Sequence, residues 1–332
     1  MKTYLLPHGL PSFKANLHTH TTLSDGILTP EEVKARYLEQ GISIVAFTDH
    51  NVLFDHTDLS DGHFLALNGY EVDITETENP RSFGSPRTCH LCFLAKDPSV
   101  RMQVCYNREK YLKADREYLR QQLIFDRDDY ERVYSHAGVN DAIRLAKEHG
   151  FYVTYNHPTW SRESWPEYSG YEGMDAMEIW NSACNTLGYP EVNDRVYDDL
   201  LSQNKRLFCV AADDMHKPVQ LGLGWIALRA PELSYGAVIE ALQKGDFYAS
   251  TGPEIRDLWV EDGTVHVTAA PVREICFSTG SRHAKRAVSE DGSPVTEAKF
   301  LLKPETDGYF RVTVTDESGR KAWTNAYWVD EM

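Results

Sequence analysis

Apolar runs of strand length alternate with helix-like segments from residue 13 to about residue 230. The runs at 42–48, 151–155 and 207–210 are short, are mostly aliphatic or aromatic, and lead into polar residues. Such runs are typical of buried strands. Because helix-like segments separate them, the pattern predicts parallel strands joined by helices, with functional side chains at the carboxyl ends of the strands.

End signals in the sequence predict four helices in this part of the chain. Thr29 begins a capping box, with Pro30 at the first helical position, and Gly41 ends this first helix. The other helices are expected from a cap at Asn140 to about Gly150, after Pro190, and from Ser234 to Gly245. Together the strands and helices indicate an α/β fold.

Two regions depart from the alternation. Between about 96 and 135, charged residues of both signs interleave with tyrosines and leucines, which predicts a helical insertion. A solvated helical hairpin is the favoured interpretation of this insertion, ahead of a lid or a dimer contact. From residue 251 onward, short alternating strands are separated by Asp-Gly turns. We therefore expect a small accessory β-sandwich at 251–332, after a large domain at 1–250.

Composition and charge exclude several classes of protein. The 332 residues include 34 basic and 50 acidic side chains, a formal net charge of −16 that argues against a general nucleic-acid binder. The N-terminus does not have the pattern of a signal peptide, and no run of 18 apolar residues exists. The six cysteines show no paired framework. We expect a cytoplasmic protein with no membrane contact.

Side chains that can bind a metal gather at the ends of the predicted strands. His18 and His20 are two residues apart, so on a strand they face the same side and can hold one ion together. Asp214 and His216 repeat this spacing near the other end of the run, whereas His90 precedes its apolar run. Imidazole and carboxylate ligands without thiolates suit Zn, Mn or Fe. The pattern therefore predicts a metallohydrolase.

The order of these motifs resembles that of the PHP family, named for polymerase and histidinol phosphatase domains. The motifs are H-x-H at 18–20, T-D-H at 48–50, a glutamate after Gly-x at 71, and D-x-H at 214–216. The resemblance covers roughly residues 13–250, and it implies a distorted (β/α)7 PHP barrel with two or three divalent metal ions at its mouth. The metal ligands that it implies are His18, His20, Asp25, His50, Glu71, His90, His157, Asp214 and His216. The tail at 245–253 is similar to a subgroup of predicted metal-dependent phosphoesterases with an appended C-terminal β domain.

Four further residues are candidates for catalysis or substrate binding. Relatives often have Gly-Ser before the final D-x-H, where this chain has Ala212 and Asp213. The carboxylate of Asp213 is a candidate general acid, or it could hydrogen-bond to one of the metal ligands. Asp49 is equally compatible with orienting the neighbouring His50 and with capping a strand end. Arg162 and Lys217 could contact an anionic group, although a plain surface charge is the favoured interpretation of each.

The expected reaction is hydrolysis of a small phosphomonoester or cyclic phosphodiester, such as a nucleotide or sugar phosphate. A hydroxide that bridges the metal ions would attack directly, and no G-x-S-x-G nucleophile motif is present. The alternatives are hydrolysis of a carbamate-like or amide-like ester at the same site, a nuclease, and a binding module with a decayed site. The expected partner is a small phosphorylated molecule, without a stable nucleic-acid partner, and the oligomeric state stays open.

Overall fold

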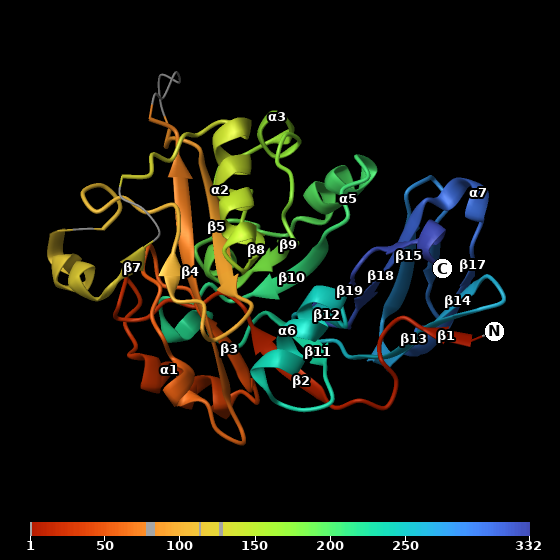
Figure 1. Cartoon of the computed structure of the whole chain (residues 1–332). Helices are drawn as coiled ribbons and strands as arrows, with labels where there is room; N and C mark the ends of the chain where they lie inside the picture. The colour runs from red at the N-terminus through yellow and green to blue at the C-terminus, as the bar shows by residue number, and fades with distance from the viewer. Residues whose placement is uncertain (1, 78–83, 113, 126–128) are drawn as a thin grey trace.

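The computed structural model of the chain describes residues 2–77, 84–112, 114–125 and 129–332 (Figure 1). Its strands are β1 (Lys2–Tyr4), β2 (Ser12–Asn16), β3 (Ile44–Phe47), β4 (Leu65–Thr75), β5 (Thr88–Ala95), β6 (Met102–Gln103), β7 (Ile124–Phe125), β8 (Phe151–Asn156), β9 (Ala176–Asn181), β10 (Phe208–Ala212), β11 (Trp225–Arg229), β12 (Phe247–Ser250), β13 (Ile255–Glu261), β14 (Thr264–Val272), β15 (Glu274–Thr279), β16 (Lys285–Ala287), β17 (Val295–Leu301), β18 (Tyr309–Thr315), β19 (Lys321–Thr324) and β20 (Tyr327–Trp328). Its α-helices are α1 (Pro30–Glu39), α2 (His136–Glu148), α3 (Trp165–Tyr168), α4 (Ser182–Thr186), α5 (Asp194–Ser202), α6 (Tyr235–Lys244) and α7 (Pro304–Asp307). The 3-10 helices are η1 (Thr57–Leu59), η2 (Ala114–Gln122), η3 (Pro218–Gln220) and η4 (Val329–Glu331).

A 14-stranded sheet runs through the molecule in the order β10-β9-β8-β5-β4-β3-β2-β11-β12-β19-β18-β15-β16, with β20 paired to β18. Strands β8, β9 and β10 are parallel to one another, and so are β2, β3 and β4. Between these two groups, β5 is antiparallel to both of its neighbours. The carboxyl ends of the six parallel strands therefore meet at one edge of the sheet, together with the amino end of β5 (Figure 1).

The predicted (β/α)7 barrel is confirmed only as a mixed α/β arrangement, because the hydrogen-bonded sheet is an open path. Its end strand β10 nevertheless curls back to the carboxyl end of β2. There, Thr19 and Met215 form an isolated parallel bridge, and the His20 backbone N donates to the Met215 carbonyl at 2.9 Å. This contact brings residues near 18 and 214 together, although they are almost 200 positions apart in the chain.

Most of the helices predicted from capping residues and glycine stops are present in the structure. Thr29 forms both hydrogen bonds of a capping box with Glu32 at the start of α1. Ser234 caps α6, and Gly245 ends it with a φ of 74°. The predicted cap at Asn140 is wrong, because α2 begins four residues earlier and is capped by Ser135. Among the described residues, no helix is long and apolar enough to cross a membrane.

The region 96–135 contains the two-residue strands β6 and β7 and the 3-10 helix η2, where a helical hairpin was favoured. Residues 113 and 126–128 of the predicted insertion lie outside the described residues. Tyr106, Leu112, Leu119 and Leu123 are buried in one hydrophobic cluster with Val52, which lies two residues after the T-D-H motif. The insertion therefore packs beside the predicted metal site.

The C-terminal strands form two sets that share one hydrophobic core. Strands β13, β14 and β17 form a four-stranded sheet with β1, and the other set continues the main sheet through the pairing of β12 with β19. Side chains of both sets, such as Leu258, Val267 and Val312, pack in the same core. A separate C-terminal sandwich is thus not confirmed, and the boundary at residue 251 stays a prediction. The single-turn helix α7 was not expected there.

Candidate metal centre

The structure brings all nine predicted ligands together at the edge where the parallel strands end. Eight of them follow a strand, or lie within one, that runs toward this edge. His90 lies near the amino end of β5, where it pairs with Asp73 on β4 and Asn156 on β8. Because β5 is antiparallel, a residue near its start reaches the same edge as residues at the ends of its neighbours. This explains why His90 precedes its apolar run.

Glu71 lies at the centre of the cluster and is only 1% exposed. Its Oε2 is 3.3 Å from His18 Nε2, 3.4 Å from His20 Nε2 and 3.1 Å from His50 Nδ1. Its Oε1 is 3.0 Å from His90 Nδ1 and 3.2 Å from His157 Nε2. The two oxygens of this carboxylate therefore face two different sets of imidazole nitrogens.

The donors around Asp214 fit a cation. The Nε2 atoms of His18 and His20 are 3.1 Å apart, and Asp214 Oδ1 is 3.2 Å from the first and 3.0 Å from the second. This oxygen is buried and has no hydrogen-bond partner among the described residues. A buried carboxylate oxygen without a donor is unfavourable. A divalent ion between these atoms would satisfy all of them with ligand types that Zn, Mn and Fe accept.

Glu178 is a functional residue that the sequence analysis missed. It is fully buried within β9, and its Oε1 is 2.7 Å from His18 Nδ1. Because an ionised carboxylate only accepts hydrogen bonds, Nδ1 of His18 carries the proton, and the lone pair of Nε2 faces Glu71 and Asp214. The other oxygen accepts from the His157 backbone N and Asn181 Nδ2, at 3.0 and 2.9 Å. The sequence signal that could have identified Glu178 is its position as the charged residue inside the otherwise apolar run 176–180.

The electrostatics of the cluster favour positive charge. Burial lowers the pKa of His20, but Asp214 and Glu71 outweigh it and raise the pKa to about 10. Burial likewise opposes protonation of His157, while Glu71 and Asp214 raise its pKa to about 9. His50 differs, because burial dominates and lowers its pKa to about 4. Without a metal, the carboxylates therefore favour protonation of His20 and His157, and bound cations would take the place of these protons.

Three ligands lie on the exposed side of the cluster. Asp25 is 3.8 Å from His50 Nε2 through Oδ2 and 3.3 Å from His216 Nε2 through Oδ1. The Nδ1 atom of His216 donates to the Asp214 carbonyl at 2.8 Å, which leaves Nε2 free to bind an ion. Four side chains here, those of His20, Asp25, His50 and His216, form one group close enough to share a cation.

The Asp213 carboxylate hydrogen-bonds to Ser182 and to the 222–224 turn, and its role as a general acid or as a partner of a metal ligand stays a prediction. Its Oδ1 accepts from Ser182 Oγ at 2.9 Å, from Leu223 N at 3.0 Å and from Gly224 N at 2.9 Å. Its Oδ2 accepts from Gly222 N at 2.5 Å. Burial raises the pKa of this carboxyl to about 6, although these hydrogen bonds oppose the shift. Asp213 therefore holds the 222–224 turn beneath the strand ends.

Asp49 holds the turn that carries Asp25. Its Oδ1 accepts from the Thr21 backbone N and from Ser24 Oγ, both at 2.7 Å, and its Oδ2 accepts from Thr21 Oγ1 at 2.8 Å. The turn at 21–25 that carries Asp25 is therefore built on this buried carboxylate. Whether Asp49 also orients the neighbouring imidazole of His50 or only caps the strand end stays a prediction.

A buried network fixes the loop that carries His157. Glu191 is fully buried and accepts from the backbone N atoms of Thr159 and Trp160, at 2.9 and 2.7 Å. Helix α5 begins three residues later, and Arg311 on β18 pairs with Asp198 of that helix through Nε at 2.8 Å. The loop at 157–161 is thereby linked to the C-terminal strands.

Two cavities open onto the cluster. The Trp160 cavity, of about 310 Å³, is lined by Trp160, Leu187 and Lys217 and by seven of the ligands. The Tyr111 cavity, of about 350 Å³, adjoins it through Asp25, His50 and His90. Lys217 lines the Trp160 cavity, and its contact with an anionic group stays a prediction beside the favoured interpretation of a plain surface charge. Arg162 is exposed and lines neither cavity.

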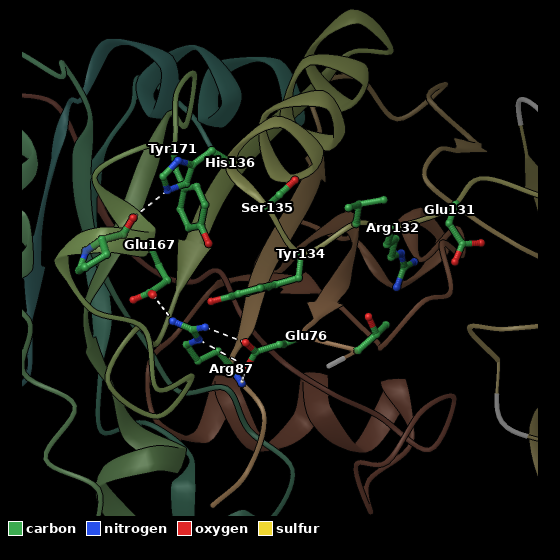
Figure 2. Close-up of a pocket in the computed structure, with 12 residues that line it drawn as sticks. Glu76, Arg87, Glu131, Arg132, Tyr134, Ser135, His136, Glu167 and Tyr171 are labelled. Atoms are coloured by element: carbon green, nitrogen blue, oxygen red, sulfur yellow. Dashed lines mark hydrogen bonds and ion pairs between the residues drawn. The ribbon is translucent and has the colours of Figure 1, made fainter. Parts of the chain in front are cut away.

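A third cavity, of about 700 Å³, is separate from the metal ligands (Figure 2). Figure 2 shows Arg87 held between Glu76 and Glu167 at this cavity, and Arg87 Nη2 donates to Glu76 Oε1 at 2.7 Å. Tyr134, also on the wall, donates to the buried Glu163 at 2.9 Å. None of the nine candidate ligands lines this cavity, so it is distinct from the candidate centre.

Comparison with known protein families identifies the part of the chain that carries the cluster. Residues 16–169 match the PHP domain family. The chain contains a PHP domain. The matched segment contains seven of the nine clustered ligands, and Asp214 and His216 of the PHP site come from the chain beyond it.

Solved structures with a similar arrangement are distant from this PHP protein. A two-domain protein from Bacteroides vulgatus containing a predicted PHP-like metal-dependent phosphoesterase is 17% identical, with 97% of this chain and 98% of that chain covered and a TM-score of 0.46. An amidohydrolase from Chromobacterium violaceum with bound sulfate is 16% identical, with 61% of this chain and 87% of that chain covered and a TM-score of 0.37. The lesion-specific endonuclease of Pyrococcus furiosus is 13% identical, with 70% of this chain and 56% of that chain covered and a TM-score of 0.41. No curated protein sequence matches the chain.

Proposed function

We propose that this PHP protein is a metal-dependent phosphoesterase that hydrolyses a small phosphomonoester or cyclic phosphodiester. The observation that carries the proposal is the position of Glu71, whose two oxygens each face a separate set of imidazole nitrogens. A carboxylate in this position can hold two cations side by side, with Asp214 and Asp25 completing their ligand sets. We infer two or three ions, and the ligand types suit Zn, Mn or Fe.

When bound, such ions lower the pKa of a coordinated water to about 7 and neutralise the charge of a phosphoryl group. The chain itself contributes position and charge. Glu71 and Asp214 keep the imidazoles close together, and Glu178 fixes the ring of His18. Lys217 lines the cavity and can bind a non-reacting phosphate oxygen. Trp160 and Leu187 line the same cavity and would offer apolar surface to the organic part of the substrate.

The proposal favours phosphate over a neutral ester because of the charge of the site. Three of the nine ligands are carboxylates, so two or three divalent ions would leave the site with a net positive charge that attracts anions. The chain as a whole has a net charge of −16, which disfavours long nucleic acids more than small phosphate esters. We therefore propose a small phosphorylated molecule as the substrate, and no stable complex with nucleic acid.

The test is phosphate release by metal-free protein reconstituted with Mn, Zn or Fe. We expect release from p-nitrophenyl phosphate or from a sugar phosphate or nucleotide in a metabolite panel, and none after chelation. In ¹⁸O-labelled water, the phosphate of a single turnover should contain one labelled oxygen. Unlabelled phosphate in the first turnover would show that a side chain attacks first. Cleavage confined to carbamate-like or amide-like esters, or to DNA, would replace the proposed function.

A further inference from the structure

The wall of the Trp160 cavity contains a glutamine whose two polar ends have different surroundings. Gln220, the last residue of η3, lines this cavity and is 4% exposed. Its Oε1 accepts from the backbone N atoms of His216 and Lys217, both at 2.8 Å. Because backbone N–H groups only donate, the amide oxygen must face them and the NH₂ group must point the other way. The backbone of a candidate metal ligand therefore fixes the orientation of this side chain.

The NH₂ end of Gln220 is unpaired but not sealed off. Its Nε2 makes no hydrogen bond with any residue that the structure describes. It also keeps accessible surface, which the fully enclosed polar atoms without a partner do not. Turning the amide over would place NH₂ against two backbone N–H groups, so this end cannot exchange its position with the oxygen. The cavity wall thus presents a fixed hydrogen-bond donor.

Two further donors on this wall are unpaired as well. Lys217 Nζ and Trp160 Nε1 form no hydrogen bond or ion pair within the described part of the chain. Lys217 is exposed and Trp160 is half-buried, so solvent reaches both side chains. The carboxylates at the cavity, those of Asp25, Glu71 and Asp214, face the imidazoles of the cluster instead. Donors without acceptors favour an anionic ligand group with several accepting oxygens.

The three donors lie next to the candidate metal ligands. Lys217 follows His216 directly, and Gln220 is bonded to the backbone of both residues. The centroid of the Trp160 ring is 5.1 Å from that of His157. A phosphoryl group carries three non-bridging oxygens over which its charge is spread. Donors beside the metal ligands can therefore bind an oxygen of the reacting group itself.

We propose that Gln220 is a substrate-binding residue whose Nε2 donates to a non-bridging oxygen of the phosphoryl group. The inference rests on the proposed phosphoesterase function and adds to it a neutral donor that no sequence motif indicated. The two ends of the amide then have separate tasks. Oε1 holds the backbone at His216 and Lys217, whereas Nε2 binds the substrate.

Two substitutions separate these tasks. Gln220→Glu keeps an oxygen for the two backbone N–H groups but replaces the donor by a charged acceptor, and Gln220→Met is neutral and removes both ends. With metal-loaded protein, kcat/KM for p-nitrophenyl phosphate, or for the most active ester of the panel, should fall at least tenfold in both variants, because a hydrogen bond to a charged oxygen is lost. The Kd of inorganic phosphate, measured by calorimetry, should rise at least tenfold.

Gln203→Glu and Gln203→Met are the matched controls. Gln203 is exposed at the end of α5 and does not line the cavity, so both variants should keep the wild-type values. Elemental analysis and the midpoint of thermal unfolding show whether each variant is folded and metal-loaded.

The two Gln220 variants exclude the simpler explanations. A purely structural role would spare Gln220→Glu, and an effect of the added charge alone would spare Gln220→Met. Either variant within twofold of wild type at equal metal content therefore overturns the inference, and the phosphoesterase function stays in place because wild type still releases phosphate. No release from any ester by wild type overturns both proposals. If Gln220→Met fails to fold, the Kd of phosphate for Gln220→Glu decides.

Discussion

The buried carboxylate of Glu178 offers a sharp test of how the metal centre is organised. One of its oxygens accepts from His18 Nδ1 at 2.7 Å, and the other accepts from His157 N and Asn181 Nδ2. Glu178→Gln keeps the shape of the side chain but offers only one accepting oxygen. If this oxygen faces His18, the new NH₂ group opposes two donors. If the amide turns over, the NH₂ group faces His18 and forces its proton onto Nε2, where it blocks metal binding.

Either orientation should weaken metal binding. Loss of a carboxylate that orients a histidine ligand costs about 10–100-fold in metal affinity, which corresponds to about 1.4–2.8 kcal/mol. Competition with a chromophoric chelator would measure the dissociation constants of Zn and Mn for wild type and variant. Glu240→Gln is the control, because Glu240 is exposed on α6 and pairs with Lys244. Dissociation constants of Glu178→Gln within twofold of wild type would refute the role of Glu178.

Four further predictions concern the centre and its supports. Glu71→Ala should abolish phosphate release and reduce bound metal below one equivalent, as elemental analysis would show; full metal content would contradict its central position. Because the pKa of His20 is raised to about 10, this ring is protonated in the metal-free protein at pH 7.5. Metal binding should therefore release protons and weaken as the pH falls, which calorimetry in two buffers would detect; no proton release would contradict this. Asp213→Ala should leave the metals bound but lower the free energy of unfolding by about 3 kcal/mol, because three backbone N–H groups lose their acceptor; unchanged stability in a denaturant titration would argue against its role in the turn. Truncation after Thr251 should favour aggregation by exposing the edge of β12, while any soluble product keeps its metals; a lost ion would show that the C-terminal strands support the site.

Local spacing at strand ends predicted the pairs His18 and His20 and Asp214 and His216, whereas the full set of nine ligands followed from the resemblance to the PHP family. The i and i+2 positions of His18 and His20 share a face whatever the rest of the fold does. His90 could be identified by its resemblance to a family motif, but its place before a strand made sense only once β5 proved to be antiparallel. Helix α1 was equally local, since its capping box lies within four residues.

The roles of the supporting carboxylates depend on partners that sequence spacing does not reveal. Asp213 and Asp214 are neighbours, yet one faces the 222–224 turn and the other faces the ligands, because Asp214 takes a φ of 51°. Glu178 meets His18 across 160 residues of intervening chain. The open path of the main sheet is likewise a long-range property, because strands with the same pattern can close a barrel or leave it open.

The pairing of β1 with β13 has a consequence for the order in which the protein matures during synthesis. Tyr4 is paired with Trp259, so the first strand must wait for a partner that is translated about 255 residues later. At about 5–20 residues per second, this delay is roughly 13–50 s. Asp214 and His216 also leave the ribosome late, long after His18 and His20. Nascent chains therefore lack part of the candidate ligand set until about two-thirds of the chain has been synthesised.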